Sequence, residues 1–495
     1  MTDRPHPTRW RYAGLAAAGV LAWASYGSGS RYTLHTAILW PGLRWQAATG
    51  GSPLRATISI VAMAALVLTW WRLRDAWVSV GWWQVTAALW FAPLIASVPL
   101  YSRDLYSYAA QGALWHEGLS PYEHGVRDLT WDWRDSTAPT WLDSPAPYGP
   151  LFLLLARGVA AVSGGHLLVA LAVLRLVAVI AVVVIVWAVP AIASRLRADP
   201  DRAAWLGVAA PLLGAHFVSG AHNDALMVAG LLLAIALALH GRYPWAIVVI
   251  ALATMVKVTA VVALPFIALL WAASRPPLSW RRVAGTAALS AGLAALPVAI
   301  VTALTGLGFS WLNPAATQGR NEQWTSLPTA VGIAIGAVGH VLGHPEWRDG
   351  GIGTMRALGL AVLGLVLVVL WLRAARRMTD EAFVVRSVGW ALLAVIVLAP
   401  AFLGWYFLWV LPVLAATVRA DEHRLVTWLA VAASVLCFAQ LPDGYSLGLT
   451  TTAVGVPVAL AVAVLLVRAG WRWVRVTDWR HFLDLPRYEA PSTLR

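Results

Sequence analysis

The sequence has little charge for its length. Of its 495 residues, 12% are charged and 60% are hydrophobic, and its mean hydropathy is +0.69. Soluble globular proteins carry roughly 25% charged residues, because the surface that faces water must be largely polar or charged. The shortage of charge excludes a disordered chain and an ordinary cytosolic enzyme. It predicts an all-α polytopic integral membrane protein.

Several kinds of chemical site are also missing. The single cysteine, Cys437, lies in an apolar run, so no internal disulfide can form and thiol chemistry is not expected. The single lysine, Lys257, is not preceded by glycine, which excludes a G-x-x-x-x-G-K-[ST] phosphate loop and ATP-driven transport by this chain alone. His340 and His344 are four residues apart but have no helically paired acid. We therefore expect no metal and no cofactor.

Long apolar runs account for most of the chain. A spanning helix needs about 20 residues, which gives about 14 crossings if 244–273 forms two short helices that meet near Lys257. Runs 149–163 and 328–343 are too short, and we expect interfacial or re-entrant helices there. The other runs are 13–23, 56–71, 82–100, 167–190, 203–219, 225–240, 283–303, 354–372, 382–400, 402–418, 425–440 and 449–467.

The distribution of basic residues predicts which side each loop faces. With both termini in the cytoplasm, the inward loops hold 24 of the 36 basic residues, the asymmetry that membrane insertion favours. The net charge of +13 then reflects inward loops and a tail that contacts membrane lipids, and we expect no nucleic-acid partner. The chain is expected to be a multi-pass protein of the cell membrane.

Six segments follow from this topology. The large loop that faces outward, with its interfacial helix, is the expected catalytic segment. The segments are N-terminal transmembrane helices (1–101), the large extracytoplasmic loop (102–166), central transmembrane helices (167–303), a second extracytoplasmic loop with a re-entrant helix (304–353), C-terminal transmembrane helices (354–468) and a basic cytoplasmic tail (469–495).

The stretch 102–148 is unusual for its acids and tryptophans. It holds three arginines, seven acids and four tryptophans. One interpretation is a sugar-binding surface, since pyranose C–H faces stack on indole rings and hydroxyl groups bond to carboxylates. The other is a solvated loop with the tryptophans of an interfacial belt. The tryptophans are Trp115, Trp131, Trp133 and Trp141.

Asp104 is the strongest candidate for a catalytic acid. It follows an apolar run, and partial desolvation at the membrane boundary is expected to raise its pKa and favour a general base that takes a proton from a hydroxyl. The alternative is an ion pair between Arg103 and Asp104 at a helix end. The residue pattern leaves both interpretations open.

Two further polar groups interrupt apolar runs. His222-Asn223-Asp224 stands at the start of a helix, where Asn or Asp can cap it, although three polar residues exceed what a cap needs. Lys257 lies inside an apolar segment, where a cation is a functional candidate; its partner is a lipid phosphate or, by snorkelling, the outer headgroups.

Other candidates lie in outward loops and corners. Arg320 is a second candidate for binding phosphate, or else a solvated charge. Tyr148-Gly149-Pro150, which follows Asp143, places proline in the first turn of a short helix. The segment from Pro400 to Tyr406, which contains Trp405, forms an outward corner between two spans, and both of these features are also compatible with a purely structural role.

Together these stretches resemble the actinobacterial polyprenol-phosphomannose-dependent α(1→6)-mannosyltransferases, the MptA/MptB group of the GT-C superfamily, and MptB more closely. The resemblance runs in order from about residue 100 to 410. The matching stretches are Ser102-Arg103-Asp104-Leu105-Tyr106-Ser107-Tyr108-Ala109-Ala110-Gln111-Gly112, Gly118-Leu119-Ser120-Pro121-Tyr122, Ala146-Pro147-Tyr148-Gly149-Pro150, His222-Asn223-Asp224-Ala225-Leu226-Met227, the Lys257 segment and Trp405-Tyr406.

The resemblance implies an inverting glycosyltransferase of GT-C fold. The expected donor is polyprenyl-phosphate-mannose and the expected acceptor a lipid-anchored α(1→6)-mannan, with Asp104 as the catalytic base at the outer face. A lone acid there, preceded by Arg103, favours a monophosphate donor over a metal-bridged pyrophosphate, and leaves open whether Asp224 or Asp143 assists. The alternative function is a transporter or flippase for lipid-linked glycans. The expected binding residues are Lys257, Arg320, His222, Asn223, Asp224, Arg103, Tyr106, Tyr148, Asp143 and Trp405.

Overall fold

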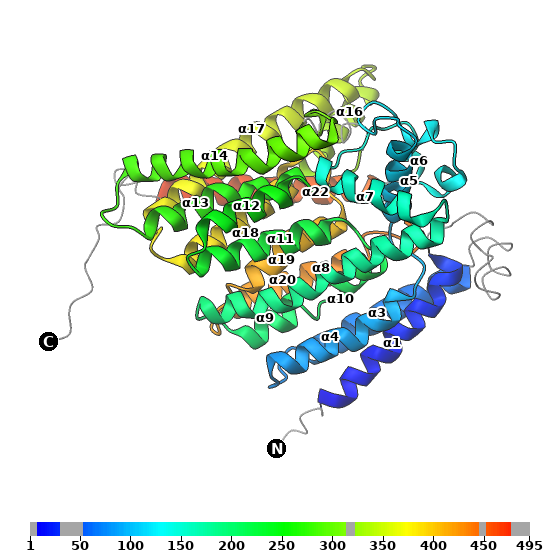
Figure 1. Ribbon diagram of the computed structural model, residues 1–495, viewed down its shortest axis with the longest axis horizontal. Coiled ribbons are helices and arrows are strands. Elements are labelled where there is room, and N and C mark those ends of the chain that lie inside the picture. The colour runs from blue at the N-terminus through cyan, green and yellow to red at the C-terminus, as the bar shows by residue number, and fades with distance from the viewer. Residues whose placement is uncertain (1–6, 30–52, 313–321, 445–451, 477–495) are drawn as a thin grey trace.

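The protein is helical throughout the residues that the structure describes. A computed structural model describes residues 7–29, 53–312, 322–444 and 452–476, and no β-strand occurs among them. The long helices lie roughly side by side, and a group of short helices is gathered at one end, on the right in Figure 1. This arrangement agrees with the predicted all-α architecture.

Three N-terminal helices form one edge of the bundle, blue in Figure 1. Arg11 fastens the first to the third, because its guanidinium donates to the Trp82 carbonyl (2.7 Å) and to Thr86 Oγ1 (2.8 Å). Trp70 and Trp205 stack with ring centroids 4.7 Å apart and join this edge to the centre. The three helices are α1 (Pro7–Ser28), α3 (Pro53–Arg72) and α4 (Val80–Ile95).

The short helices at one end come from the predicted outward loop. The helix that begins at Asp104 packs against the helix that begins at Pro150, where proline occupies the first turn as the sequence predicts. This group is α5 (Asp104–His116), η2 (Val126–Asp128), η3 (Asp132–Ser136), α6 (Pro139–Leu142) and α7 (Pro150–Ser163).

The central helices are repeatedly broken near this end. The predicted interruption at Lys257 is present, because one helix ends at Thr254 and the next begins at Val258. The run predicted over 203–219 is divided by Pro211 and ends in a π-helix. The central elements are α8 (Leu167–Arg195), α9 (Pro200–Gly207), α10 (Pro211–Leu213), η4 (Gly214–Ser219), α11 (Asp224–Leu239), α12 (Tyr243–Thr254), η5 (Val258–Ala263), α13 (Leu264–Ala273) and α14 (Trp280–Thr305).

The C-terminal elements close the bundle. Hydroxyl groups of Thr325, Ser326 and Thr329 donate to the carbonyls of Phe402, Ala399 and Pro400, with distances of 2.7–2.8 Å. These bonds hold the corner before Trp405 in place. The elements are η6 (Ser310–Leu312), α16 (Leu327–Val341), α17 (Trp347–Arg376), α18 (Glu381–Leu398), η7 (Gly404–Tyr406), α19 (Phe407–Ala415), α20 (His423–Leu436) and α22 (Thr452–Val476).

Five of the described helices are long and apolar enough to cross a bilayer, namely α3, α8, α14, α17 and α18. A sixth span results if the bent pair Pro211–Ser219 and Asp224–Leu239 is counted as one. Most other predicted spans coincide with shorter apolar helices, because the breaks described above divide the runs. The predicted number of about 14 crossings therefore stays a prediction.

Candidate active site

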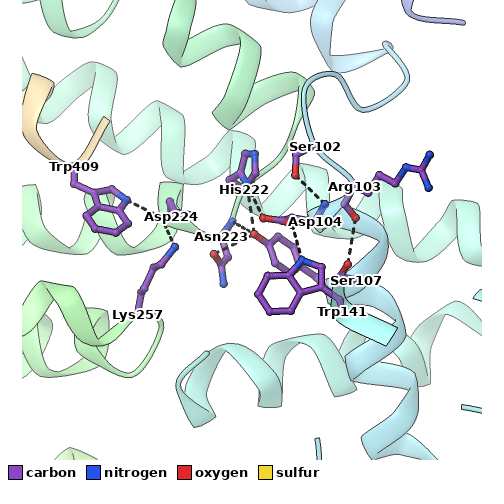
Figure 2. Close-up of polar contacts among 11 residues, drawn as sticks. Ser102, Arg103, Asp104, Ser107, Trp141, His222, Asn223, Asp224, Lys257 and Trp409 are labelled. Carbon is purple, nitrogen blue, oxygen red and sulfur yellow. Dashed lines mark hydrogen bonds and ion pairs between the residues drawn. The ribbon is translucent and has the colours of Figure 1, made fainter. Parts of the chain in front are cut away.

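Asp104 is the first residue of α5 and lies at the centre of a polar cluster. Its Oδ1 accepts a hydrogen bond from Trp141 Nε1 at 3.2 Å, and its Oδ2 lies 3.4 Å from His222 Nδ1. The Asp104 side chain is 12% exposed and the His222 side chain is fully buried. Figure 2 shows Asp104 held between these two partners.

The environment of Asp104 changes its acidity in the direction opposite to the one that we expected. Burial by itself would raise the pKa of Asp104, but the hydrogen bond and charge of His222 lower it. The charge of Lys257 and the hydrogen bond from Trp141 lower it further, so the pKa lies below its usual value. The expectation of a raised pKa was wrong because it counted desolvation and not the buried donors. Asp104 is therefore a carboxylate at neutral pH.

The turn that carries His222, Asn223 and Asp224 is sharply bent. It joins the segment Pro211–Ser219, made of α10 and η4, to α11, and the two axes differ by 118°. Ala221, just before the turn, has φ +47°, a conformation that costs free energy in a residue with a side chain. Tyr108 on α5 donates to Asn223 Oδ1 at 3.2 Å, which ties the turn to the helix of Asp104. Neither Asn223 nor Asp224 is a simple helix cap, since the Asn223 side chain makes no capping bond.

Asp224 and Lys257 form a buried ion pair. Lys257 Nζ donates to Asp224 Oδ1 at 2.7 Å, and Trp409 Nε1 donates to the same oxygen at 2.6 Å (Figure 2). The ammonium also lies over the rings of Tyr406 and Trp409, 4.6 and 4.9 Å from their centroids. Lys257 therefore does not snorkel outward; it points to an acid and two aromatic rings inside the protein.

The Tyr148-Gly149-Pro150 motif contacts the segment before Lys257, where the helix is interrupted. The Gly149 amide donates to the Val256 carbonyl at 3.2 Å. A Cβ atom at Gly149 would collide with the Met255 carbonyl, so the close approach of the two segments requires glycine. Tyr148 is buried and its ring packs on those of Tyr108 and Phe152.

Trp405 covers the other side of His222. The two rings stack with centroids 4.1 Å apart and an interplanar angle of 23°. The corner that precedes Trp405 therefore has a structural role, because it places the indole ring on the imidazole of His222, which contacts Asp104. The Trp405 side chain is 5% exposed.

A cavity of about 210 Å³ lies against Asp104. Of the residues predicted for the site, Arg103, Asp104 and Trp405 line it. Its remaining wall comes from neighbouring Ser102 and from residues that are distant in the sequence. They include Ser102, Thr140, Trp141, Gln323, Gln440 and Asp443.

Most predicted site residues are brought together, with some exceptions. Asp143 lies apart from the cluster, because its carboxylate is half exposed and pairs with Arg127 at 2.5 and 2.7 Å. Tyr106 is buried on α5 but makes none of the contacts described above. Arg320 and residues 477–495 of the predicted tail lie outside the described residues.

Arg175 and Gln440, in and around the site, were missed by sequence reasoning, whereas Trp141 was predicted only as one of four tryptophans of the outward loop. Arg175 lies within the apolar run of α8 and donates to the carbonyls of Ser97 (2.6 Å) and Ser219 (2.7 Å), which fixes the ends of two elements beside the site. An arginine in a spanning helix is itself a signal of a special role, and it could have been noticed. No local pattern marks Trp141 or Gln440 among the other tryptophans and glutamines. Within the described residues, no group of three or more His, Cys, Asp or Glu side chains is arranged to hold a metal.

The chain is similar to proteins of one family over most of its length. Residues 11–273 match the model of the alpha-(1->6)-mannopyranosyltransferase N-terminal domain, and residues 328–469 match the MptB C-terminal domain. Alpha-(1->6)-mannopyranosyltransferase A of Mycobacterium tuberculosis is 33% identical over 365 residues, covering 73% of this chain and 70% of the relative. A probable alpha-(1->6)-mannopyranosyltransferase of Mycolicibacterium smegmatis is 31% identical, covering 83% and 79%. Alpha-(1->6)-mannopyranosyltransferase B of Corynebacterium glutamicum is 28% identical, covering 80% and 69%.

Proposed function

Because the chain belongs to the alpha-(1->6)-mannopyranosyltransferase family, we propose that it is a membrane mannosyltransferase that extends a lipid-anchored α(1→6)-mannan on the extracytoplasmic face. The proposed donor is polyprenyl-phosphate-mannose and the proposed fold is that of the GT-C enzymes, with both termini in the cytoplasm. The observation that carries the proposal is the Asp104 carboxylate at the wall of a cavity, ionised and held by Trp141 and His222.

Asp104 acts as the general base. A hydroxyl of the acceptor gives its proton to the Asp104 carboxylate as its oxygen attacks the anomeric carbon of the donor. The bond from that carbon to the phosphate oxygen breaks, polyprenyl phosphate leaves with the electron pair, and the anomeric configuration inverts. The hydrogen bonds that lower the pKa of Asp104 keep it in the form that accepts the proton.

Lys257 and Arg320 neutralise the departing phosphate. An ammonium has three N–H donors, and Asp224 accepts one of those of Lys257. The ion pair and the two aromatic rings hold the ammonium in a fixed place, so that little reorganisation is needed when negative charge develops on the phosphate. Asp224, and not Asp143, is then the second acid of the site, and it acts by placing Lys257. No metal is required in this scheme.

An apolar groove beside Lys257 suits the prenyl chain. It has a volume of about 300 Å³ and lies between α7, α8, α11 and α12. Its lining contains only apolar side chains and one glycine; two lining residues, Leu151 and Val256, are chain neighbours of Pro150 and Lys257. On α12 the lining of the groove extends from Val249 to Ala253, a length of about 6 Å at 1.5 Å per residue, and Val256 continues it in the break that follows. A prenyl chain in this groove would bring its phosphate close to Lys257.

The test is transfer by the purified full-length protein in lipid vesicles. Polyprenyl-phosphate-[¹⁴C]mannose and an alkyl α(1→6)-mannobioside are supplied, and the product is separated by chromatography. We expect a labelled trisaccharide with an α(1→6) linkage. If no trisaccharide forms and the labelled lipid instead equilibrates between the two leaflets, the proposed transferase is wrong and a flippase is supported.

A further inference from the structure

The cavity beside Asp104 has walls of a distinctive chemical kind. They combine two indole rings, two side-chain amides and two carboxylates, contributed by segments that are far apart in the sequence. These residues are Trp141, Trp405, Gln323, Gln440, Asp104 and Asp443, and Arg103 lines the same space. We call this space the glutamine cavity.

Polar atoms of these walls are buried. Gln440 is 5% exposed and Gln323 is 7% exposed. Gln440 Oε1 and Trp405 Nε1 find no hydrogen-bond partner among the described residues. Buried polar atoms are nearly always paired in folded proteins, which means that a partner from outside the chain is expected here. The partner has to accept a hydrogen bond from an indole N–H and donate one to an amide oxygen.

A hydroxyl group can do both, since it donates one hydrogen bond and accepts others. A prenyl chain would leave Gln440 Oε1 and Trp405 Nε1 unpaired. The carboxylates of Asp104 and Asp443 outnumber the one guanidinium of Arg103 in the lining, so a net negative charge disfavours an anion in this space. Indole rings provide flat apolar surfaces for the C–H face of a sugar. These walls therefore suit a neutral pyranose ring.

The position of the cavity selects the acceptor sugar over the donor sugar. Asp104, the proposed base, belongs to the cavity wall, whereas Lys257, the proposed phosphate ligand, does not. In Figure 2 Lys257 lies with Asp224 on the left, and Trp141 lies with Asp104 to their right. The cavity and the apolar groove share no residue.

We propose that the glutamine cavity binds the terminal pyranose of the acceptor glycan, with Gln323 and Gln440 as residues that recognise its hydroxyl groups. This inference rests on the proposed function, because it takes Asp104 as the base. Gln323 and Gln440 belong to none of the motifs that the sequence analysis identified.

The kinetic test uses Gln440→Leu and the double variant Gln323→Leu/Gln440→Leu. Each lost hydrogen bond should raise the acceptor KM roughly two- to tenfold, and the double variant should raise it more than Gln440→Leu alone. The donor KM should not change. Gln84→Leu is the matched control, because Gln84 lies on α4 and donates to the Val186 carbonyl outside the cavity. A rise in the donor KM equal to that in the acceptor KM would overturn the proposal.

A binding test separates this inference from the proposed function. Thr140 is exposed at the cavity, and the native Cys437 is buried, so Thr140→Cys creates one accessible thiol among the described residues. Alkyl α(1→6)-mannobioside should slow maleimide labelling of this thiol even when no donor is present. Protection without transfer would contradict the proposed function alone. Transfer without protection, or protection by the donor lipid alone, would contradict the acceptor site.

Discussion

The Nζ atom of Lys257 lies 2.7 Å from Oδ1 of Asp224, and this ion pair is buried next to the cluster around Asp104. The two residues are 33 positions apart and come from two different helix breaks. Their charges cancel, so that the only lysine of the chain is stabilised in an apolar environment.

We predict that the double substitution of this pair destabilises the protein less than either single substitution. Lys257→Met leaves a buried carboxylate and Asp224→Leu leaves a buried ammonium, and either change should cost about 3–5 kcal/mol. Lys257→Met/Asp224→Leu should recover much of that loss and remain inactive. Thermal unfolding in detergent gives the stabilities of the wild type and the three variants for the double-mutant cycle. The transfer assay measures the activity of each. A double variant that loses the sum of the two single losses would exclude the energetic coupling.

Asp104→Asn should abolish most transfer. The amide keeps the size of the side chain but cannot accept the proton, and a positioned general base contributes about 10²–10⁴ in rate. Initial rates at saturating donor measure the loss. Asp135→Asn is the comparison, since Asp135 lies in the same loop, is exposed and pairs only weakly with Arg134 at 3.7 Å. Near-normal turnover by Asp104→Asn would eliminate Asp104 as the base.

The dependence of activity on pH should report the contact between Asp104 and His222. Burial raises the pKa of Asp104, and His222 is the main influence that lowers it. His222→Gln removes that influence, so the pKa rises and the acid limb of kcat/KM moves to higher pH. His124→Gln, which affects an exposed histidine paired with Asp128, should leave the profile in place. An unchanged acid limb in His222→Gln would show that the histidine does not set the pKa of Asp104.

Gly149→Ala should displace Lys257, although Gly149 itself lies outside the polar cluster. The added methyl collides with the Met255 carbonyl, which displaces the segment that carries Lys257 and lowers both stability and kcat. Gly158→Ala on α7 is the matched control, because no atom lies within 4 Å of its added Cβ. The control should be neutral or up to about 1 kcal/mol more stable, as expected for alanine in a helix. Equal behaviour of the two variants would refute the close approach at Gly149.

Much of the fold was predictable because it depends on local properties of the chain. Apolar runs bounded by charges and prolines predicted the helices, the start of α7 at Pro150 and the break at Lys257. Polar residues in apolar surroundings identified His222, Asn223, Asp224 and Lys257. They do meet, since burying such groups in a membrane protein requires partners, and the other interrupted runs supply them.

The sequence by itself thus determined a helical membrane protein with polar residues at its helix breaks. Only the tertiary structure decided which residues meet: that Lys257 pairs with Asp224, that Trp141 and His222 hold Asp104, that Asp143 lies apart, and that Gln323 and Gln440 line one cavity. Hydropathy and helix breaks are set by neighbouring residues, whereas these contacts join positions many residues apart. The lowered pKa of Asp104 depends on those contacts, and for that reason composition and spacing gave its direction wrongly.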